Sequence, residues 1–166
     1  RQAKNHAIDV TASLELPESI LMVDPYVLGA WLGDGTSTCG QIAGIDEEVF
    51  HEVVNAGYPV TRHKNKYSRG VHGGFVGHLR QIGVLGNKHI PPVYLRASHS
   101  QRLALLQGLM DTDGYCDKRG QCEITLTRKA LVDGVYELIL SLGSKVVMHE
   151  SRARLNGKDC GPRWRL

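Results

Sequence analysis

The chain has 166 residues, 42% of them hydrophobic, and a formal net charge of +3. This length and composition allow one domain, or two tightly joined halves, around a real core, and they exclude general disorder. Gly or Asp interrupts every long apolar stretch well before the roughly 18 residues that a membrane helix needs. We therefore expect no membrane span and no signal peptide, and a cytoplasmic protein.

The charge is unevenly distributed along the chain. Residues 1–50 carry eight acidic and two basic side chains, whereas residues 51–104 carry eight basic side chains and one acidic. Residues 118–166 again are basic, with ten basic side chains against five acidic. Two basic blocks suggest a surface for a polyanion, although an ordinary solvated surface would give the same pattern.

The expected elements of the first half follow a lead-in, residues 1–24, that has no clear element. The apolar run VLGAWLGDG at 27–35 predicts a helix. In the first half as a whole, residues 25–86, we expect that helix, two strands, a helix over 46–57 that Asp46 caps, strands over 58–67, and a closing helix over 76–84. A linker over 87–100 follows, and its Pro91-Pro92 pair is expected to stop any helix.

The second half, residues 101–166, repeats this pattern. The run LQGLMDTDG at 106–114 matches the first run, and Gly-Gln recurs beyond both, at 40–41 and 120–121. A helix is predicted over 127–143 with Thr127 as its N-cap, followed by strand-like alternation over 144–155. No counterpart of the closing helix is expected. The chain therefore reads as an internal duplication, helix–strand–strand–helix–strand–strand in each copy.

Small residues within the two apolar runs predict that the runs pack against each other. On a helix, Gly29 and Gly33 share one face, and each glycine costs about 1 kcal/mol relative to Ala. Close approach of a second helix explains that cost, and the matching positions in the other copy are Gly108 and Thr112. Asp34 and Asp113 would then emerge side by side where the two helices end.

Two adjacent carboxylates repel unless a cation lies between them. Helix C-termini also offer free carbonyl groups, so Asp34, Asp113 and the backbone at Gly33 and Thr112 form a set of hard oxygen ligands. Such a set favours Mg²⁺, with Mn²⁺ or Ca²⁺ as substitutes. The duplication therefore predicts a divalent metal site on its own symmetry axis.

Other metal sites fit the sequence less well. Cysteines 39, 116, 122 and 160 form no CxxC pair and have the wrong spacing for zinc, even with His149. An EF-hand that begins at Asp111 would need Gly and Glu where Cys116 and Cys122 stand. An Asp-x-Asp site of a sugar transferase, at Asp111 and Asp113, would leave the first copy unexplained.

The paired segments resemble the motifs of LAGLIDADG homing endonucleases, and the resemblance extends from about Val23 to Leu166. The segments DPYVLGAWLGDG, NKHIP and LTRKALVDGVYELILSLG are most similar to the subgroup within inteins. The resemblance implies an α+β, pseudo-twofold αββαββ fold with both motif helices at its centre and two antiparallel sheets forming a saddle over DNA. It also implies a monomer that acts as a pseudo-dimer.

The implied activity is Mg²⁺-dependent, site-specific cleavage of both strands of a long asymmetric DNA target. Asp34 and Asp113 match the catalytic metal ligands, and Lys88 matches the lysine that polarises water or stabilises the transition state. The strands and turns would place the following residues on DNA: Gln41, Arg62, Lys64, Lys66 and Arg69 on one half-site, and Lys118, Arg119, Gln121, Arg152, Arg154, Arg163 and Arg165 on the other.

Departures from the family pattern keep a second reading open. Leu32 replaces an often acidic motif residue, and the second half offers no candidate for a basic residue that often follows its last strands. The residues of intein splicing are also missing, so self-splicing is not expected. The alternative function is a sequence-specific DNA-binding module with weak or absent catalysis.

Overall fold

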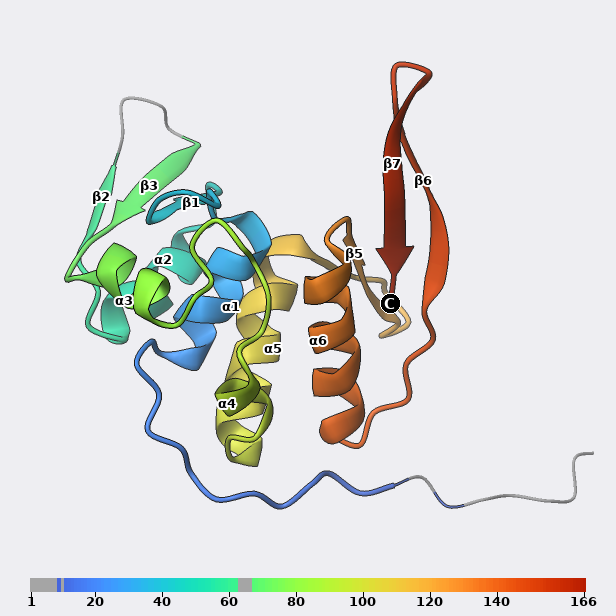
Figure 1. Ribbon diagram of the computed structural model, residues 1–166, viewed down its shortest axis with the longest axis horizontal. Coiled ribbons are helices and arrows are strands. Elements are labelled where there is room, and N and C mark those ends of the chain that lie inside the picture. The colour runs from blue at the N-terminus through green and yellow to red at the C-terminus, as the bar shows by residue number, and fades with distance from the viewer. Residues whose placement is uncertain (1–8, 10, 63–66) are drawn as a thin grey trace, which may run out of the picture.

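The computed structural model describes residues 9, 11–62 and 67–166. Helices α1 (Pro25–Asp34) and α5 (His99–Asp113) lie side by side at the centre, and a small sheet stands on each side of them (Figure 1). Both helices end between two raised β-hairpins, so the outline is that of a saddle (Figure 1). The predicted α+β fold with two antiparallel sheets is confirmed.

Helix α1 is the most enclosed element. Asp24 caps it by accepting a hydrogen bond from the Val27 amide, and Pro25 occupies its first turn, where no amide donor is needed. The six consecutive residues 27–32 are all buried, as expected for a helix that is apolar on every side. Helix α1 is therefore a buried core helix rather than a surface helix.

Helix α5 begins at a capping box. The Gln101 amide donates to the Ser98 hydroxyl, and the Gln101 side chain accepts from the Ser98 amide. This pairing satisfies two backbone donors at the helix start. The helix runs on to Asp113, and β4 follows it directly from Gly114.

The first half contains β1 (Gln41–Ala43), α2 (Glu47–Asn55), β2 (Val60–Arg62), β3 (Ser68–Val71) and α3 (Phe75–Gln81). Its sheet has the order β1-β3-β2, and Asp46 caps α2 as predicted. One expectation is wrong: a single strand, not two, lies between α1 and α2 in the described chain. The segment after α1 turns back at Thr36, and only Gly35 forms a bridge, to Ile42.

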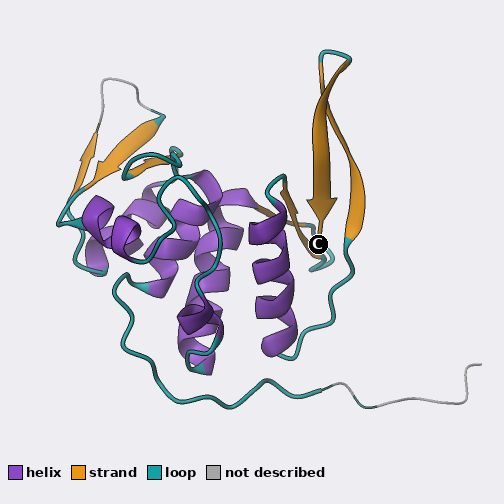
Figure 2. Cartoon of the chain, viewed as in Figure 1, coloured by secondary structure: helices purple, strands orange, loops and turns teal. Residues whose placement is uncertain are grey.

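The second half contains β4 (Gly114–Cys116), β5 (Cys122–Leu126), α6 (Lys129–Ser141), β6 (His149–Leu155) and β7 (Lys158–Arg165), in the sheet order β4-β5-β7-β6. The predicted cap at Thr127 is wrong, because Arg128 occupies the N-cap position without a side-chain bond. The hairpin between β6 and β7 turns at Asn156 and Gly157, whose φ angles of 49° and 79° suit a tight turn (Figure 2).

The proline pair does not exclude helix. Helix α4 (Pro92–Leu95) begins at Pro92, with Pro91 as its N-cap. Proline is well suited to the first helical position, because its fixed φ fits and its missing amide would be unpaired there anyway. The Tyr94 hydroxyl of this short helix donates to the Val23 carbonyl, which ties the linker to the entry of α1.

Residues 11–24 form no helix or strand and run beneath the helices as a strap (Figure 1). The Leu14 amide donates to the Ser141 carbonyl, and the Gln101 side chain bonds both backbone groups of Ser19. Fully buried Arg102 binds the strap to α6 by donating to the carbonyls of Leu14 and Ser141. One hydrophobic core joins both halves. No helix in the described ranges is long and apolar enough to cross a membrane.

Candidate functional site

The central helices touch through their glycines. A Cβ on Gly29 would lie 2.2 Å from the Leu105 carbonyl oxygen, and one on Gly108 would lie 2.1 Å from the Tyr26 carbonyl oxygen. Real side chains do not approach backbone atoms so closely, so each glycine lets the other helix's backbone fill the space. The contact is reciprocal between the two copies of the motif.

One turn further on, the two helix ends meet. A Cβ on Gly33 would lie 2.1 Å from the Thr112 Oγ1 and 3.5 Å from the Asp113 Cβ. The Thr112 hydroxyl donates back to the Gly108 carbonyl at 2.9 Å, so it belongs to its own helix. The structure thus brings Gly33, Thr112 and the two motif aspartates into one small region.

Burial raises the pKa of both motif aspartates. Partial burial raises the pKa of Asp34, and the Lys88 ammonium opposes this shift. Loss of hydration likewise raises the pKa of Asp113, the negative charge of Asp34 raises it further, and Lys88 again opposes. Repulsion of this kind is the electrostatic signature of a position where a cation is stabilising.

Lys88 is buried, only 7% exposed, beneath the end of α1. Its ammonium donates to the carbonyl oxygens of Leu32 and Gly33 at 3.0 and 2.9 Å and stands 5.1 Å from the centre of the Trp31 ring. Burial is the main cause that lowers its pKa to about 8, against the opposing pull of Asp113. A surface loop lysine would show none of these features.

The oxygen ligands at the helix ends fit a divalent cation, but fewer of them are available than the sequence suggested. The Gly33 carbonyl already accepts from the Lys88 ammonium, and the Thr112 hydroxyl points into its helix. The carboxylates of Asp34 and Asp113 are the charged protein ligands, the Thr112 carbonyl stays a predicted one, and Mg²⁺ commonly completes such a shell with water and phosphate oxygens. No group of three or more His, Cys, Asp or Glu side chains gathers in the described residues.

A pocket of about 290 Å³ opens beside Asp113 and Lys88. Arg128 at the start of α6 lines it and donates to the Ser37 hydroxyl at 3.2 Å. Its positive charge helps to lower the pKa of Lys88. Sequence analysis missed Arg128, because nothing in the local pattern places the N-terminus of α6 beside the end of α1.

The second sheet has one face open and one face against the core. Ile124, Leu126 and Trp164 are buried, and their neighbours in the strands point the other way. A hollow of about 420 Å³ on that open face is lined by Glu123, Thr125, His149, Ser151, Arg163 and Arg165. Arg163 donates to Ser151 at 3.1 Å, and Arg165 lies 3.6 Å from Glu123.

Arg152 and Arg154 lie on the other face of the ribbon. Their positions in β6 alternate with Ser151, and Arg152 pairs with Asp159 at 2.9 Å. The four arginines expected on one half-site are thus split between two faces. Lys118, Arg119 and Gln121 are all exposed at the β4–β5 turn.

In the first half, Arg69 is buried whereas Arg62 is exposed. Arg62 and Arg69 are directly opposed in the sheet, and both pair with Glu47 of α2. Arg69 is only 8% exposed and covers the Phe50 ring at 4.2 Å. Arg69 is therefore poorly placed for the expected contact with DNA, whereas Arg62 pairs with the same carboxylate but keeps 75% of its side chain exposed. Lys64 and Lys66 lie outside the described residues.

The open face of the first sheet carries different side chains. Gln41 stands opposite Gly70, and Thr61 follows on the same face. Sequence analysis named Gln41 but missed Thr61 and Ser68, together with Thr125, His149 and Ser151 in the second sheet. Strand alternation could have found them, because every second residue of a half-covered sheet faces outward.

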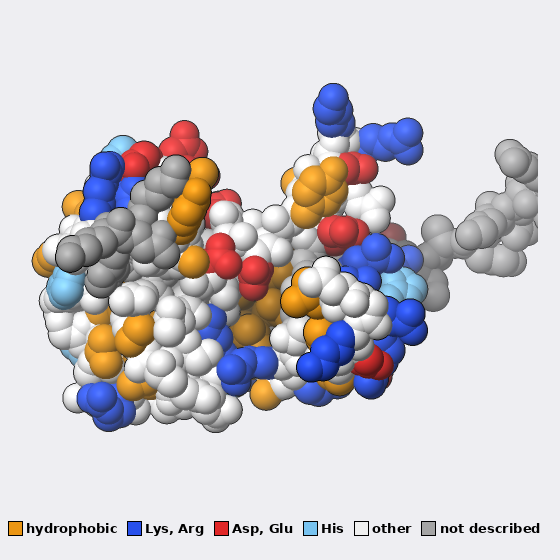
Figure 3. Space-filling view, turned by 90° about the horizontal axis from the view of Figure 1, so that it is seen from above, with side chains coloured by type: hydrophobic (Ala, Val, Ile, Leu, Met, Phe, Trp, Pro, Cys, Tyr) orange, Lys and Arg blue, Asp and Glu red, His pale blue; other side chains and the backbone are white. Residues whose placement is uncertain are grey.

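Seen from above, the molecule is hollowed between the two hairpins (Figure 3). Acidic side chains lie at the centre of this view, and Lys and Arg side chains lie on both sides of it together with further acidic ones (Figure 3). This distribution places negative charge where a cation would bind and positive charge where a polyanion would extend.

Comparison with known proteins agrees with this geometry. Residues 100–162, which include α5 after its first residue and the motif aspartate Asp113, match the family model described as LAGLIDADG-like domain. The chain is also 43% identical, over 150 residues, to a replicative DNA helicase DnaB of Mycobacterium intracellulare; the match covers 90% of this chain and 24% of that protein. The chain thus spans about a quarter of the length of this relative. Residues 100–162 are thus similar to the LAGLIDADG-like domain family.

Proposed function

We propose that this chain is a site-specific, Mg²⁺-dependent DNA endonuclease that cuts both strands of a long asymmetric target. The observation that carries the proposal is the meeting of Asp34 and Asp113 at the ends of two glycine-packed helices, between two sheets with open faces. The family match of the second half supports the same activity.

The chemistry follows from the residues around the helix ends. A divalent ion bound there supplies charge stabilisation at a phosphate and acidifies water. Asp34 and Asp113 hold the negative charge that binds it, each in one half of the chain. Lys88, with its pKa near 8, is poised to give or accept a proton close to neutral pH and adds positive charge beside the phosphate.

DNA binding is assigned to the two open sheet faces and the β4–β5 turn. Arg163, Arg165, Lys118 and Arg119 supply the positive charge on the second half, while Gln41 and Thr61 offer hydrogen bonds on the first. Contacts of the arginines with phosphates would make affinity fall with salt. Because both halves lie in one chain, the protein acts as a monomer.

The similarity to about a quarter of a replicative helicase supports an intein context, in which the endonuclease lies within a segment inserted into a host protein. Cleavage of an uninterrupted host gene would then promote homing of the insertion. A nuclease with this role works in the compartment that holds the chromosome, which for a bacterial host is the cytoplasm.

One observation favours a second candidate, a DNA-binding module without catalysis. The Gly33 carbonyl, an expected metal ligand, already accepts from Lys88, so it contributes less to metal binding. A site of this kind binds metal more weakly than one with additional protein donors, and a decayed enzyme would retain the DNA-binding faces. Both candidates share the same DNA surface.

Cleavage of a plasmid library with genomic inserts separates the two. The wild-type chain is assayed with Mg²⁺ and with EDTA, beside Asp34→Asn and Asp113→Asn, and Asp133→Asn serves as a control because Asp133 lies on α6 and pairs with Lys129. Specific cuts that disappear in EDTA and in both motif variants, but persist in the control, establish the nuclease. Retarded DNA without cuts under any metal supports the binding module. If the chain neither cuts nor retards DNA, the DNA assignment is wrong.

A further inference from the structure

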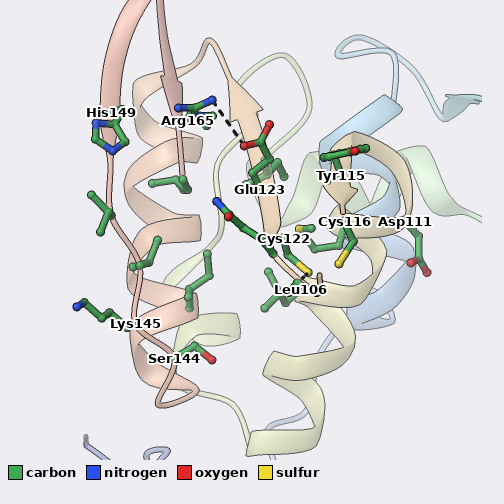
Figure 4. Close-up of a pocket in the computed structure, with 18 residues that line it drawn as sticks. Leu106, Asp111, Tyr115, Cys116, Cys122, Glu123, Ser144, Lys145, His149 and Arg165 are labelled. Carbon is green, nitrogen blue, oxygen red and sulfur yellow. Dashed lines mark hydrogen bonds and ion pairs between the residues drawn. The ribbon is translucent and has the colours of Figure 1, made fainter. Parts of the chain in front are cut away.

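Cys116 and Cys122 form a directly opposed pair at the end of the β4–β5 hairpin. Both are exposed free thiols. Figure 4 shows their sulfur atoms next to each other on the same side of the hairpin, at the edge of a pocket of about 800 Å³. Neither the metal site nor the DNA-binding residues use this pair.

The register of the hairpin sets the spacing of the pair. The Asp117 amide donates to the Gln121 carbonyl at 2.9 Å, so Asp117 and Gln121 are a hydrogen-bonded pair of the antiparallel ladder. The adjacent pair, Cys116 and Cys122, is then of the non-hydrogen-bonded kind, whose Cα atoms lie about 4.5 Å apart. Disulfides span Cα separations of about 4.4–6.8 Å, so this pair falls within the required range.

The turn holds the two strands in this register. The Gly120 amide donates to the Asp117 carbonyl at 3.0 Å, and Gly120 has a φ of +81°, which a residue with a side chain rarely adopts. The Asp117 carboxylate accepts from the amides of Arg119 and Gln121 at 2.8 and 2.9 Å. The thiols are therefore brought together by the register of the hairpin backbone and not merely by one choice of side-chain rotamers.

We propose that Cys116 and Cys122 are a reversible redox site that a two-electron oxidant such as hydrogen peroxide converts into a disulfide across the hairpin. The thiolate of one cysteine attacks a peroxide oxygen, the O–O bond breaks, and a sulfenic acid and water form. The second thiol then attacks the sulfenic sulfur, which forms the S–S bond and releases a second water. Exchange with a small dithiol restores both thiols.

Two properties of the pair follow from its surroundings. A hydrogen bond with Cys122 is the main cause that raises the pKa of Cys116, so less thiolate is present at neutral pH and oxidation accelerates as the pH rises. The opposed thiol also has an effective concentration on the order of millimolar, which exceeds that of a second protein molecule at micromolar concentration by about a thousandfold. The internal disulfide thus forms ahead of dimers and ahead of sulfinic or sulfonic acids.

The sequence of the turn provides a direct test, because Lys118 and Arg119 lie between the two cysteines. The full chain is treated with a small excess of hydrogen peroxide, the remaining thiols are blocked with N-ethylmaleimide, and the protein is digested with trypsin. Trypsin separates the two cysteines, so their peptides stay joined only through a disulfide. Cys39→Ser/Cys160→Ser keeps the pair alone, and Cys116→Ser removes it.

We expect the linked peptides in the wild type and in the double variant, at a yield at least about tenfold above any peptide linked to Cys160. They separate in dithiothreitol and are absent from Cys116→Ser, whose circular dichroism spectrum matches that of the wild type. The proposal is overturned if both cysteines carry N-ethylmaleimide at a peroxide dose that oxidises exposed Cys160. It is also overturned if dimers linked through Cys160 form first. No DNA is needed, so this outcome is independent of the nuclease assay.

Discussion

The Lys88 ammonium donates to the Gly33 carbonyl oxygen at 2.9 Å, so a buried lysine caps the C-terminal end of α1. This carbonyl lies one residue before the motif aspartate. The bond is favourable, but burial of the ammonium is not, and the low pKa of about 8 shows that the unfavourable term is larger.

Lys88→Met should therefore stabilise the metal-free protein at pH 7 while removing any activity that depends on the amine. In the unfolded chain the amine keeps its proton up to a pKa of about 10.5, whereas the folded chain loses it near pH 8. Between these values the unfolded state binds more protons, so wild-type stability rises with pH, by roughly 3 kcal/mol in total from this group. Urea unfolding in EDTA at pH 7.5 and 9.5 should show a shallower pH dependence in the variant. Equal slopes for both proteins would contradict the burial of a charged Lys88.

Gly108→Ala should break the central helix contact. The new Cβ would lie 2.1 Å from the Tyr26 carbonyl oxygen, so α1 and α5 must move apart. We expect a loss of about 3 kcal/mol or more, at the upper end for overpacked sites. Gly77→Ala in α3 is the matched control, because a Cβ there meets nothing within 4 Å, and it should gain roughly 0.5–1 kcal/mol. Thermal unfolding of both variants measures the difference; equal effects would contradict the close contact.

Arg102→Met should release the strap. The buried guanidinium donates to the carbonyls of Ala97, Leu14 and Ser141, and its removal leaves a buried acceptor without its partner. We expect a loss of about 2–3 kcal/mol in urea unfolding, together with faster proteolysis within residues 11–24. Arg96→Met is the control, because exposed Arg96 pairs with Glu137 and the Leu95 carbonyl at the surface and should cost less than about 1 kcal/mol. If proteolysis of the strap does not change, Arg102 does not hold it.

Arg163→Ala should weaken DNA binding more than Arg152→Ala. Arg163 lies on the open sheet face, whereas Arg152 lies on the opposite face and pairs with Asp159. If Arg163 contacts a phosphate, its removal lowers the slope of log affinity against log salt by about 1. Fluorescence anisotropy with a target duplex at several salt concentrations gives both values. A larger effect of Arg152 would show that DNA lies on the other face of the ribbon.

The sequence predicted the features that occur in both copies, because the same pattern found twice rarely arises by chance. Two apolar runs with glycines at matching places and an aspartate at each end were enough to predict the central helices, while the two-sheet fold came from the resemblance to the LAGLIDADG family. Asp46 as the cap of α2 was equally accessible, since a cap is a local hydrogen bond.

Features that depend on contacts between segments far apart in the chain could not be predicted from the sequence. Arg69 looks like a surface cation in the sequence, yet it is buried against Glu47 and the Phe50 ring, while Arg62 opposite it stays exposed. No local sequence pattern identifies Arg128, because its place beside Lys88 depends on how α6 packs near the end of α1. The wrong expectation at Pro91-Pro92 came from treating proline only as a helix breaker, although it also begins helices.

The buried ammonium under α1 makes the two copies of the motif unequal. Among the residues that the structure describes, no lysine is seen to donate to the last carbonyls of α5 as Lys88 does to those of α1. A nuclease of the proposed kind would then have one fast and one slow centre. Its two strands would be cut in a preferred order, and supercoiled plasmid would pass through an open nicked circle before it becomes linear.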